Sequence, residues 1–220
     1  MKHFFWVSAI GGSVLSLALG MSTAMAGDAA LVGDANAGAA KALTCGACHG
    51  TNGMALSPEW PNLAAQHHEY TQQQLAYLKS GVRVAAAMNA MAAALSAQDM
   101  ADLASYFEKQ TPTGLESDAG LAQAGQALYR SGVASRNIPS CMGCHGPNGR
   151  GNGPAKWPQI RGQNASYVAT QLTHYAENAR YTSVAGQAAV DANAEIMMTI
   201  AKRLRPEEIK ALAAYVQGLR

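Results

Sequence analysis

The sequence is poor in strand-forming patterns, in aromatic side chains and in charge. Aromatic residues make up 6% of the chain and charged residues 14%. Alternation of apolar and polar residues is nearly absent, so the pattern predicts an all-α fold. After residue 26 no apolar run is long enough to cross a membrane. The basic residues are scattered and lack interleaved aromatic side chains, which argues against a partner made of nucleic acid.

The first 26 residues have the features of a secretory signal peptide. A weakly basic start precedes an apolar run that ends near Leu19, and Ala-Met-Ala at 24–26 is a small-residue cleavage site. We therefore expect residues 1–26 to be removed and the exported chain to begin at Gly27. An uncleaved membrane anchor is the alternative for this stretch.

Cysteine is also scarce, and all four cysteines lie in two copies of one motif, Cys-x-x-Cys-His, at 45–49 and 141–145. This spacing is typical of covalent haem attachment, because two thiols bond to the porphyrin vinyl groups and the histidine supplies an iron ligand. We therefore predict two covalently bound haem c groups. The predicted attachment sites are Cys45, Cys48, Cys141 and Cys144, and the predicted axial ligands are His49 and His145.

A redox dithiol and a zinc site are the alternatives for a pair of cysteines at this spacing. A dithiol does not require a histidine directly after the second cysteine, yet histidine follows in both copies. A zinc site would have to bring together two motifs that lie 96 residues apart. Both alternatives explain the pattern less completely than haem does.

The two motifs belong to a longer internal repeat. The motif and the Gly-x-Asn-Gly sequence after it recur at an offset of 96 residues. Further pairs recur at an offset of 97: Trp60 and Trp157, Pro61 and Pro158, Tyr70 and Tyr167, Arg83 and Arg180. A repeat of this length is too long for a solenoid unit and predicts two tandem domains of one fold.

The segment 110–119 contains proline, glycine and polar residues and has no periodicity, as is typical of a linker. We place a first domain at 27–112 and a second at 113–220. The expected helices of the first are 36–43, 68–80 and one that starts at Ser96 in a capping box with Asp99. Those of the second are 121–129, 165–179 and one that starts at Pro206.

Two glycines and two prolines occupy matching places in the halves. Gly38 and Gly125 lie in the first helix of each half, where glycine allows close helix packing. Pro61 and Pro158 follow the loop after each haem motif, where a prolyl carbonyl can accept the ring N–H of the iron-bound histidine. The alternative for these prolines is a simple turn.

Each domain is small and has few aromatic side chains, so it buries modest apolar area. A covalent haem would supply much of the missing core. We therefore expect that neither half folds well without its haem.

The second iron ligand is sought among the methionines, because methionine raises the reduction potential and closes the iron to small molecules. Met88 and Met197 each precede a leucine by seven residues, at an offset of 109. Met91 and Met198 have no methionine at the matching position. We predict Met88 and Met197 as axial ligands, with Met91 and Met198 as substitutes. Packing around the porphyrin edge is the alternative role for the pair.

With these residues assembled, the chain resembles the dihaem cytochrome c4 family over essentially all of its length after residue 26. The resemblance rests on both haem motifs, the Trp-Pro pairs, the two methionines and the closing sequences L-A-S-Y-F and L-A-A-Y-V. It implies two cytochrome c-like domains related by a pseudo-twofold, with the haem propionate edges facing each other. It also implies electron delivery in the periplasm, often to a haem-copper terminal oxidase.

We therefore expect a periplasmic electron carrier rather than an enzyme. Its donor would be a quinol-oxidising complex or a dehydrogenase and its acceptor a terminal oxidase, with the carrier a monomer or weak dimer that can attach loosely to the inner membrane. An electron-accepting subunit of a dehydrogenase complex is one alternative. A haem peroxidase with a five-coordinate iron is another, and the paired methionines argue against it.

The two halves differ in charge and in one insertion. Residues 27–115 contain four basic and seven acidic residues, whereas 116–220 contain eleven basic and seven acidic ones. Such a dipole can orient the protein toward a partner. The second half also has about 12 extra residues between Arg180 and Met197, and we expect them to reach a loop that presents Met197.

Overall fold

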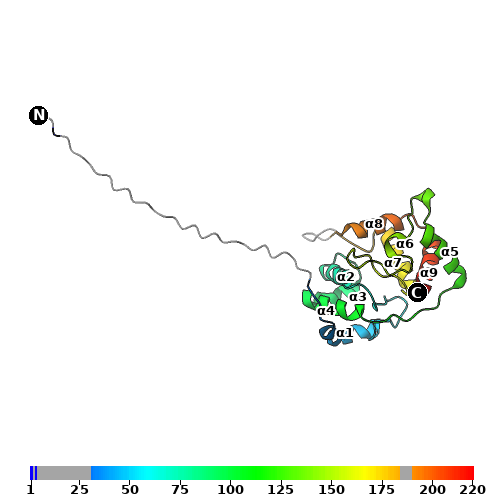
Figure 1. The fold of residues 1–220 in the computed structure, drawn as a ribbon, viewed down its shortest axis with the longest axis horizontal. Helices are drawn as coiled ribbons and strands as arrows, with labels where there is room; N and C mark the ends of the chain where they lie inside the picture. The colour runs from blue at the N-terminus through cyan, green and yellow to red at the C-terminus, as the bar shows by residue number, and fades with distance from the viewer. Residues whose placement is uncertain (2, 4–30, 184–189) are drawn as a thin grey trace. The chain divides into compact units, whose positions relative to one another are not determined.

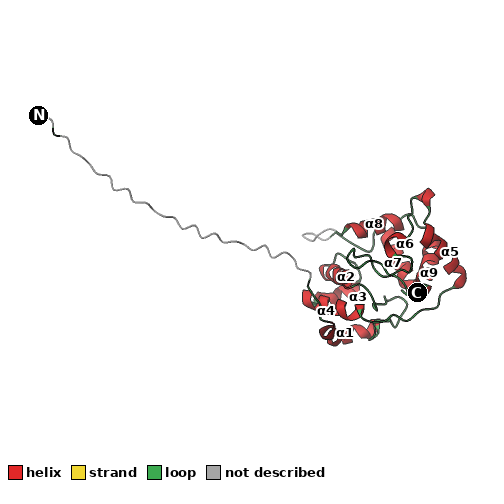
Figure 2. Ribbon diagram, in the orientation of Figure 1, coloured by secondary structure: helices red, strands yellow, loops and turns green. Residues whose placement is uncertain are grey.

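The computed structural model describes residues 1, 3, 31–183 and 190–220. The expected signal peptide at 1–26 lies almost wholly outside the described residues. Residues 31–220 form one compact unit. In its described part every regular element is a helix, and the β contacts are isolated bridges (Figure 1, Figure 2). The all-α prediction is confirmed.

Each half contributes a set of helices in the same order. The first half has α1 (Ala35–His49), α2 (His68–Ser80), α3 (Ala86–Ala93) and α4 (Ala97–Glu108). The second has α5 (Ala119–Ser131), a short 3-10 helix (Ala134–Arg136), α6 (Met142–His145), α7 (Ala165–Ala176), α8 (Ala192–Ala201) and α9 (Pro206–Gly218). Residues 111–118, around the predicted domain boundary, form no helix or strand.

The expected helices all occur, and three of them have different ends. The helix expected at 36–43 continues through the first haem motif to His49, and its C-cap is Gly50, which has a φ of 70°. The helix expected at 121–129 spans Ala119–Ser131, and the one expected at 165–179 ends at Ala176. The capping box is confirmed: Ser96 Oγ accepts from the Asp99 amide, and Asp99 accepts from the Ser96 amide at 2.9 Å.

The halves repeat the same helix packing. The most extensive contacts join α1 to α4 and α5 to α9, followed by α2 with α4 and α7 with α9. Gly38 and Gly125 sit at the tightest points. A Cβ on Gly38 would lie 2.1 Å from the Asp102 carbonyl oxygen, and one on Gly125 would lie 2.0 Å from that of Ala211. The expected role of these glycines in close packing is confirmed.

Small side chains make up much of each protein core. One apolar cluster joins Ala42, Leu103 and Phe107, and the other joins Leu128, Tyr129, Leu212, Tyr215 and Val216. Among the described residues Tyr129 is the one large side chain that is completely buried. The half-buried Cys45 and Cys141 pack against these clusters, which places each haem motif beside a core that is small by itself.

Loops rather than helices join the two halves in the described part of the chain, since no helix of one half packs extensively on a helix of the other. Four buried residues, two from each half, form reciprocal hydrogen bonds in which a glutamine side chain of one half bonds to the backbone of the other. The backbone N–H of Asn62 donates to Gln163 Oε1 at 2.7 Å, and Gln163 Nε2 donates back to the backbone carbonyl of Asn62 at 2.9 Å. In the same way, the backbone N–H of Gln159 donates to Gln66 Oε1 at 2.9 Å, and Gln66 Nε2 donates to the backbone carbonyl of Gln159 at 2.8 Å. Because Asn62 matches Gln159 and Gln66 matches Gln163 in the repeat, the contacts obey a pseudo-twofold.

A second contact lies where the chain leaves α2 and α7. The Val84 amide donates to the Arg180 carbonyl at 2.9 Å, and the Thr182 amide donates to the Val82 carbonyl at 2.8 Å. These bonds form an antiparallel bridge between Arg83 and Tyr181. The bridge brings Arg83 and Arg180, which match in the repeat, to the same place between the halves.

Candidate haem-binding sites

The first haem motif lies in the last turns of α1. Spacings of three and four residues put Cys45, Cys48 and His49 on one side of the helix. Cys45 is half-buried and Cys48 is exposed, while His49 is only 5% exposed. Both thiols are free. The helix therefore places two thiols and one buried imidazole where all three can bind the same group.

The second motif has the same arrangement on a shorter helix. Cys141 stands at the N-terminal end of α6 and His145 at its last position. Cys141 is half-buried, Cys144 is exposed, and His145 is buried. Between the paired glycine and the motif, the second half has nine more residues than the first, and they form the loop that separates α5 from α6.

Each motif histidine is held by a prolyl carbonyl. His49 Nδ1 lies 2.9 Å from the Pro61 carbonyl oxygen, and His145 Nδ1 lies 3.0 Å from that of Pro158. A carbonyl can only accept, so Nδ1 carries the proton and Nε2 keeps its lone pair. The expected prolyl contact is confirmed. This arrangement fixes the ring and leaves the nitrogen that can bind iron free.

Burial keeps these groups in defined protonation states. It lowers the pKa of His49 and of His145, and the positive charge of Arg83 lowers the pKa of His49 further. Both imidazoles are therefore neutral, as metal ligation requires. Burial also raises the pKa of Cys45 and raises that of Cys141 to about 11. A reactive redox dithiol would need a lowered thiol pKa, so the environment does not fit that alternative.

Both predicted methionine ligands lie on short helices. Met88 is on α3 and Met197 is on α8, and both are half-buried. The expectation that a loop presents Met197 is wrong, because Asp191 caps α8 and the helix has begun by Ala192. Part of the insertion, residues 184–189, lies outside the described residues. The substitute Met91 is 46% exposed, which makes it the weaker candidate in the first half.

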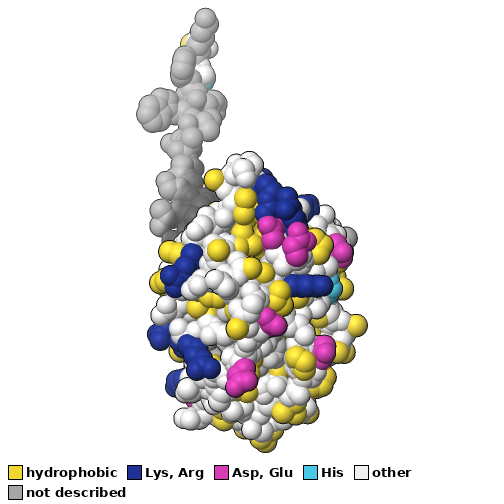
Figure 3. All heavy atoms as spheres, turned by 90° about the vertical axis from the view of Figure 1, so that its right-hand side faces the viewer, with side chains coloured by type: hydrophobic (Ala, Val, Ile, Leu, Met, Phe, Trp, Pro, Cys, Tyr) yellow, Lys and Arg dark blue, Asp and Glu magenta, His cyan; other side chains and the backbone are white. Residues whose placement is uncertain are grey.

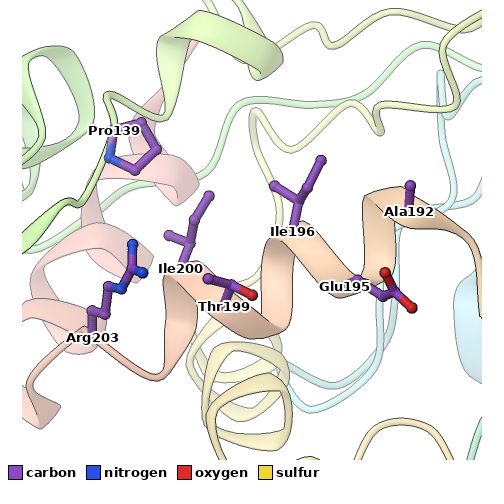
Figure 4. Close-up of a pocket in the computed structure, with 7 residues that line it drawn as sticks. All are labelled: Pro139, Ala192, Glu195, Ile196, Thr199, Ile200 and Arg203. Carbon is purple, nitrogen blue, oxygen red and sulfur yellow. The ribbon is translucent and has the colours of Figure 1, made fainter.

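The methionine helices pack on the middle helix of their own half. Among the described helices, α3 packs mainly on α2 and α8 mainly on α7, and neither packs extensively on the helix that carries the motif. A pocket of about 400 Å³ lies between Pro139, two residues before Cys141, and α8 (Figure 4). Ile196 and Ile200 extend from α8 on the side where Pro139 lies. Met197 itself does not line this pocket, but its neighbours on α8 do.

The donor set and its surroundings fit a covalent haem in each half. Two thiols and an oriented neutral imidazole come from each motif, and each half has a short helix, α3 or α8, that carries the predicted methionine ligand. When bound, each haem iron supplies a one-electron couple between Fe(II) and Fe(III). The chain's own part is to attach, orient and cover the group.

Comparison with known proteins agrees with this description. The cytochrome c family model matches the chain twice, at residues 35–111 and 122–220. Cytochrome c4 of Azotobacter vinelandii is 42% identical over 214 residues, which cover 93% of this chain and 96% of the relative. The crystal structure of reduced recombinant cytochrome c4 from Pseudomonas stutzeri has a TM-score of 0.78 and 38% identity, over 86% of this chain and 100% of that one. A thiosulfate dehydrogenase electron acceptor of Stutzerimonas stutzeri is 32% identical over 98% of this chain and 95% of its own length.

The fold and the sites define a c-type cytochrome built from two tandem cytochrome c domains related by a pseudo-twofold. The chain carries two covalently bound haem c groups and transfers electrons. It belongs to the dihaem cytochrome c4 family.

Sequence reasoning missed the polar residues between the halves. Arg83, Arg180, Tyr70 and Tyr167 were recognised as repeat pairs, but no role followed from that match. Gln66 and Gln163 also match in the repeat. A signal was present, because polar residues kept at matching positions of both halves have a common task. Their burial between the halves, however, is visible only in the folded chain.

Proposed function

We propose that this chain is a periplasmic electron carrier that passes electrons one at a time through a respiratory chain toward a terminal oxidase. The observation that best supports this proposal is the geometry that His49 and His145 share. Each buried ring donates Nδ1–H to a prolyl carbonyl and keeps Nε2 for iron. A geometry that is kept in both halves supports two haems with the same task.

In this proposal Cys45 and Cys48 attach the first haem, and Cys141 and Cys144 attach the second. His49 and Met88 are the axial ligands of the first iron, and His145 and Met197 those of the second. Methionine opposite histidine favours the reduced iron and blocks substrate binding, which suits a carrier better than an enzyme. The proposed domain limits remain 27–112 and 113–220.

The surface near each motif supports electron exchange with a docked protein. Cys48 and Cys144 are exposed, so a haem edge attached there would reach the surface. Met142 and Cys144 in the second motif, and Ile196 on α8, are exposed apolar residues of the second half. On the face drawn in Figure 3, lysine and arginine side chains form separate groups with acidic side chains between them.

The ligand assignment is tested by the intact mass and the visible and near-infrared spectra of the purified protein. We expect the mass of two haems and the near-infrared band of methionine-ligated ferric haem. Met88→Leu and Met197→Leu should each remove about half of that band, since each half contributes one ligand. Met91→Leu and Met198→Leu are the matched controls and should keep it. Loss of the band in a control variant, with Met88→Leu unchanged, would reassign the ligand.

The second candidate is the electron-accepting subunit of a dehydrogenase complex. It is favoured by the relative named thiosulfate dehydrogenase electron acceptor, which matches nearly the whole chain. Rapid-mixing experiments separate the candidates. The carrier function expects fast oxidation of the reduced protein by membranes that contain terminal oxidase. Fast reduction by purified thiosulfate dehydrogenase, together with slow oxidation by those membranes, would favour the second candidate.

The proposed location is the periplasm, with residues 1–26 removed. None of the helices in the described part of the chain is long and apolar enough to cross a membrane. N-terminal sequencing of the native protein should begin at Gly27. A salt wash that moves the protein from the membrane fraction to the soluble fraction would show peripheral attachment to the inner membrane.

A further inference from the structure

Three side chains of metal-binding type meet where α2 begins and α4 ends, and none of them belongs to the haem sites. His67 is the N-cap residue of α2, Glu69 lies in its first turn, and Glu108 is the last residue of α4. One ligand atom from each lies within 4.8 Å of those from the other two. All three residues are half-buried, so an ion from the solvent can reach them.

The ring of His67 is turned so that a lone pair faces this group. Its Nε2 lies 2.7 Å from the carbonyl oxygen of Arg150, and a carbonyl can only accept, so Nε2 carries the proton. Nδ1 faces Glu108 Oε1 at 3.9 Å, which is too long for a hydrogen bond. A histidine that donates one ring nitrogen to a carbonyl and turns the other toward a carboxylate has the orientation of a metal ligand.

Glu108 is held in place by His68 and not by a lysine or arginine. The backbone N–H of His68 donates to Glu108 Oε1 at 3.1 Å, and its ring Nδ1 lies 3.0 Å from Oε2. The same Nδ1 lies 3.4 Å from Glu69 Oε2. In the described part of the chain no lysine or arginine forms an ion pair with Glu69 or Glu108. The two carboxylates therefore lie close together without a permanently charged partner.

The second half repeats this contact with neutral side chains. Glu108 matches Gln217 at the offset of 109. The backbone N–H of Ala165 donates to Gln217 Oε1 at 2.8 Å, which repeats the bond that Glu108 accepts. The two remaining positions are also neutral there, with Asn164 in place of His67 and Ser166 in place of Glu69. A neutral set thus suffices to join α7 to α9, so the packing of α2 on α4 does not require the imidazole and the carboxylates.

We propose that His67, Glu69 and Glu108 form a binding site for a divalent transition-metal ion of the Zn²⁺ type. Three protein ligands of nitrogen and oxygen, completed by water, are a set that zinc accepts. Zinc–ligand distances of about 2.0–2.2 Å require the three side chains to rotate slightly toward one another. His68 would orient Glu108 from outside, as the Arg150 carbonyl orients His67. The imidazole disfavours Ca²⁺ and Mg²⁺, which take oxygen ligands.

A bound ion would also strengthen the contact between the halves. Arg150 belongs to the loop after the second haem motif, and its carbonyl holds the ring of His67. Gly153 of the same loop lies against Glu69, since a Cβ there would lie 2.7 Å from Glu69 Oε2. The first half supplies the ligands and this loop of the second half lies against them. Because an ion that binds only the folded protein stabilises it, the melting temperature should rise with the zinc concentration.

The test titrates Zn²⁺ into the haem-loaded full chain by isothermal titration calorimetry. Covalent haem occupies the four cysteine sulfurs, which as free thiols would bind zinc themselves. We expect one ion per chain. Glu108→Gln, which gives the first half the residue of the second, and His67→Ala should each weaken binding at least about tenfold. His174→Ala on α7 and the exposed Glu177→Gln are the matched controls and should keep the affinity.

Each other outcome would overturn the site. Absence of zinc binding, or binding that is equally tight in His67→Ala and Glu108→Gln, would show that these residues are not ligands. Competition by Ca²⁺ at equal concentration would show a simple pair of carboxylates. Should a variant fail to fold, anomalous scattering at the zinc edge from zinc-soaked crystals of the native protein must show a peak beside His67 Nδ1, and a map without that peak refutes the site. Intact mass and the near-infrared band report on the haems separately, so the carrier function stands or falls independently of this result.

Discussion

Asp102 is a buried carboxylate whose charge is balanced by Lys41. The Lys41 Nζ lies 2.5 Å from Asp102 Oδ2, while Oδ1 accepts from the Asp34 amide and from Gln98 Nε2, both at 2.8 Å. These bonds, with that of Lys41 first, hold the pKa of Asp102 at about 2. The matching residue of the second half is Ala211, so only the first half uses this network to join α1 to α4.

Replacing Asp102 should change how stability depends on pH. A carboxyl with a lowered pKa stabilises the folded state above its unfolded pKa, and this contribution is lost as the pH falls through the folded value. The stabilisation by Asp102 is therefore lost as the pH falls from 3.8 to about 2. We expect Asp102→Asn to melt at a lower temperature than the native chain at pH 7. Its melting temperature should then fall less than that of the native chain as the pH is lowered. Thermal melts from pH 7 to 2 measure this, with the exposed Glu177→Gln as control. A parallel decline of both melting curves would contradict the assignment.

At the scale of elements, each half depends on one close crossing of its first and last helices. In the second half α5 meets α9 at Gly125, where a Cβ would lie 2.0 Å from the Ala211 carbonyl oxygen and 2.8 Å from Tyr215 Cβ. Backbone atoms of a buried helix cannot move aside cheaply. The two helices can therefore approach this closely only because Gly125 has no side chain.

A methyl group at this crossing should destabilise the second half. We expect Gly125→Ala to lower the free energy of unfolding by about 1–3 kcal/mol or more, the usual cost of overpacking a core. Gly120→Ala is the control on the same helix, since the nearest atom to its Cβ would be a carboxylate oxygen at 3.4 Å. Alanine there should be neutral or stabilising, because it is the better helix former. Urea unfolding of the haem-loaded protein compares them, and equal effects would show that the crossing tolerates a side chain.

At the scale of the whole molecule, the halves meet through a reciprocal set of buried amides. Gln163 exchanges two hydrogen bonds with the backbone of Asn62, and Gln66 exchanges two with the backbone of Gln159. These bonds join positions that match in the repeat. Polar groups that are buried between domains must be fully paired, since an unpaired one is costly.

Removal of either glutamine should therefore weaken the interface to a similar degree. Gln163→Ala and Gln66→Ala each remove the partner of two backbone N–H groups and one C=O, at a cost of about 1–3 kcal/mol for each group that stays unsatisfied. Hydrogen exchange of the Asn62 amide in Gln163→Ala, and of the Gln159 amide in Gln66→Ala, should become faster. The exposed Gln123→Ala serves as control. Strongly unequal effects of the two variants would argue against a symmetric interface.

The small protein cores make the fold depend on its cofactors. Tyr129 is the one completely buried large side chain among the described residues, and much of the remaining core is alanine. We expect haem-free protein to lack a cooperative thermal transition in circular dichroism. A double variant with Cys141→Ser and Cys144→Ser should carry the mass of one haem and lose the transition of its second half. Native-like melting of the haem-free chain would show that the protein core suffices.

The sequence by itself determined the features that depend on local spacing. The Cys-x-x-Cys-His motifs, the prolyl partners of both histidines, the capping box at Ser96 and the helix at 68–80 all follow from residues close together in the chain. The repeat at offsets of 96 and 97 also predicted the duplication. Such features are readable because backbone geometry and short-range hydrogen bonds are set within a few residues.

Only the tertiary structure decided what depends on the meeting of distant segments. The short helix α3 is rich in alanine, has no charged residue and shows no apolar stripe, so periodicity could not identify it, and α8 likewise begins within an unmatched insertion. Arg180 and Gln163 are polar and would be placed on the surface by composition alone. They are buried because the two halves close around them. That burial is a property of the packed molecule and not of its local sequence.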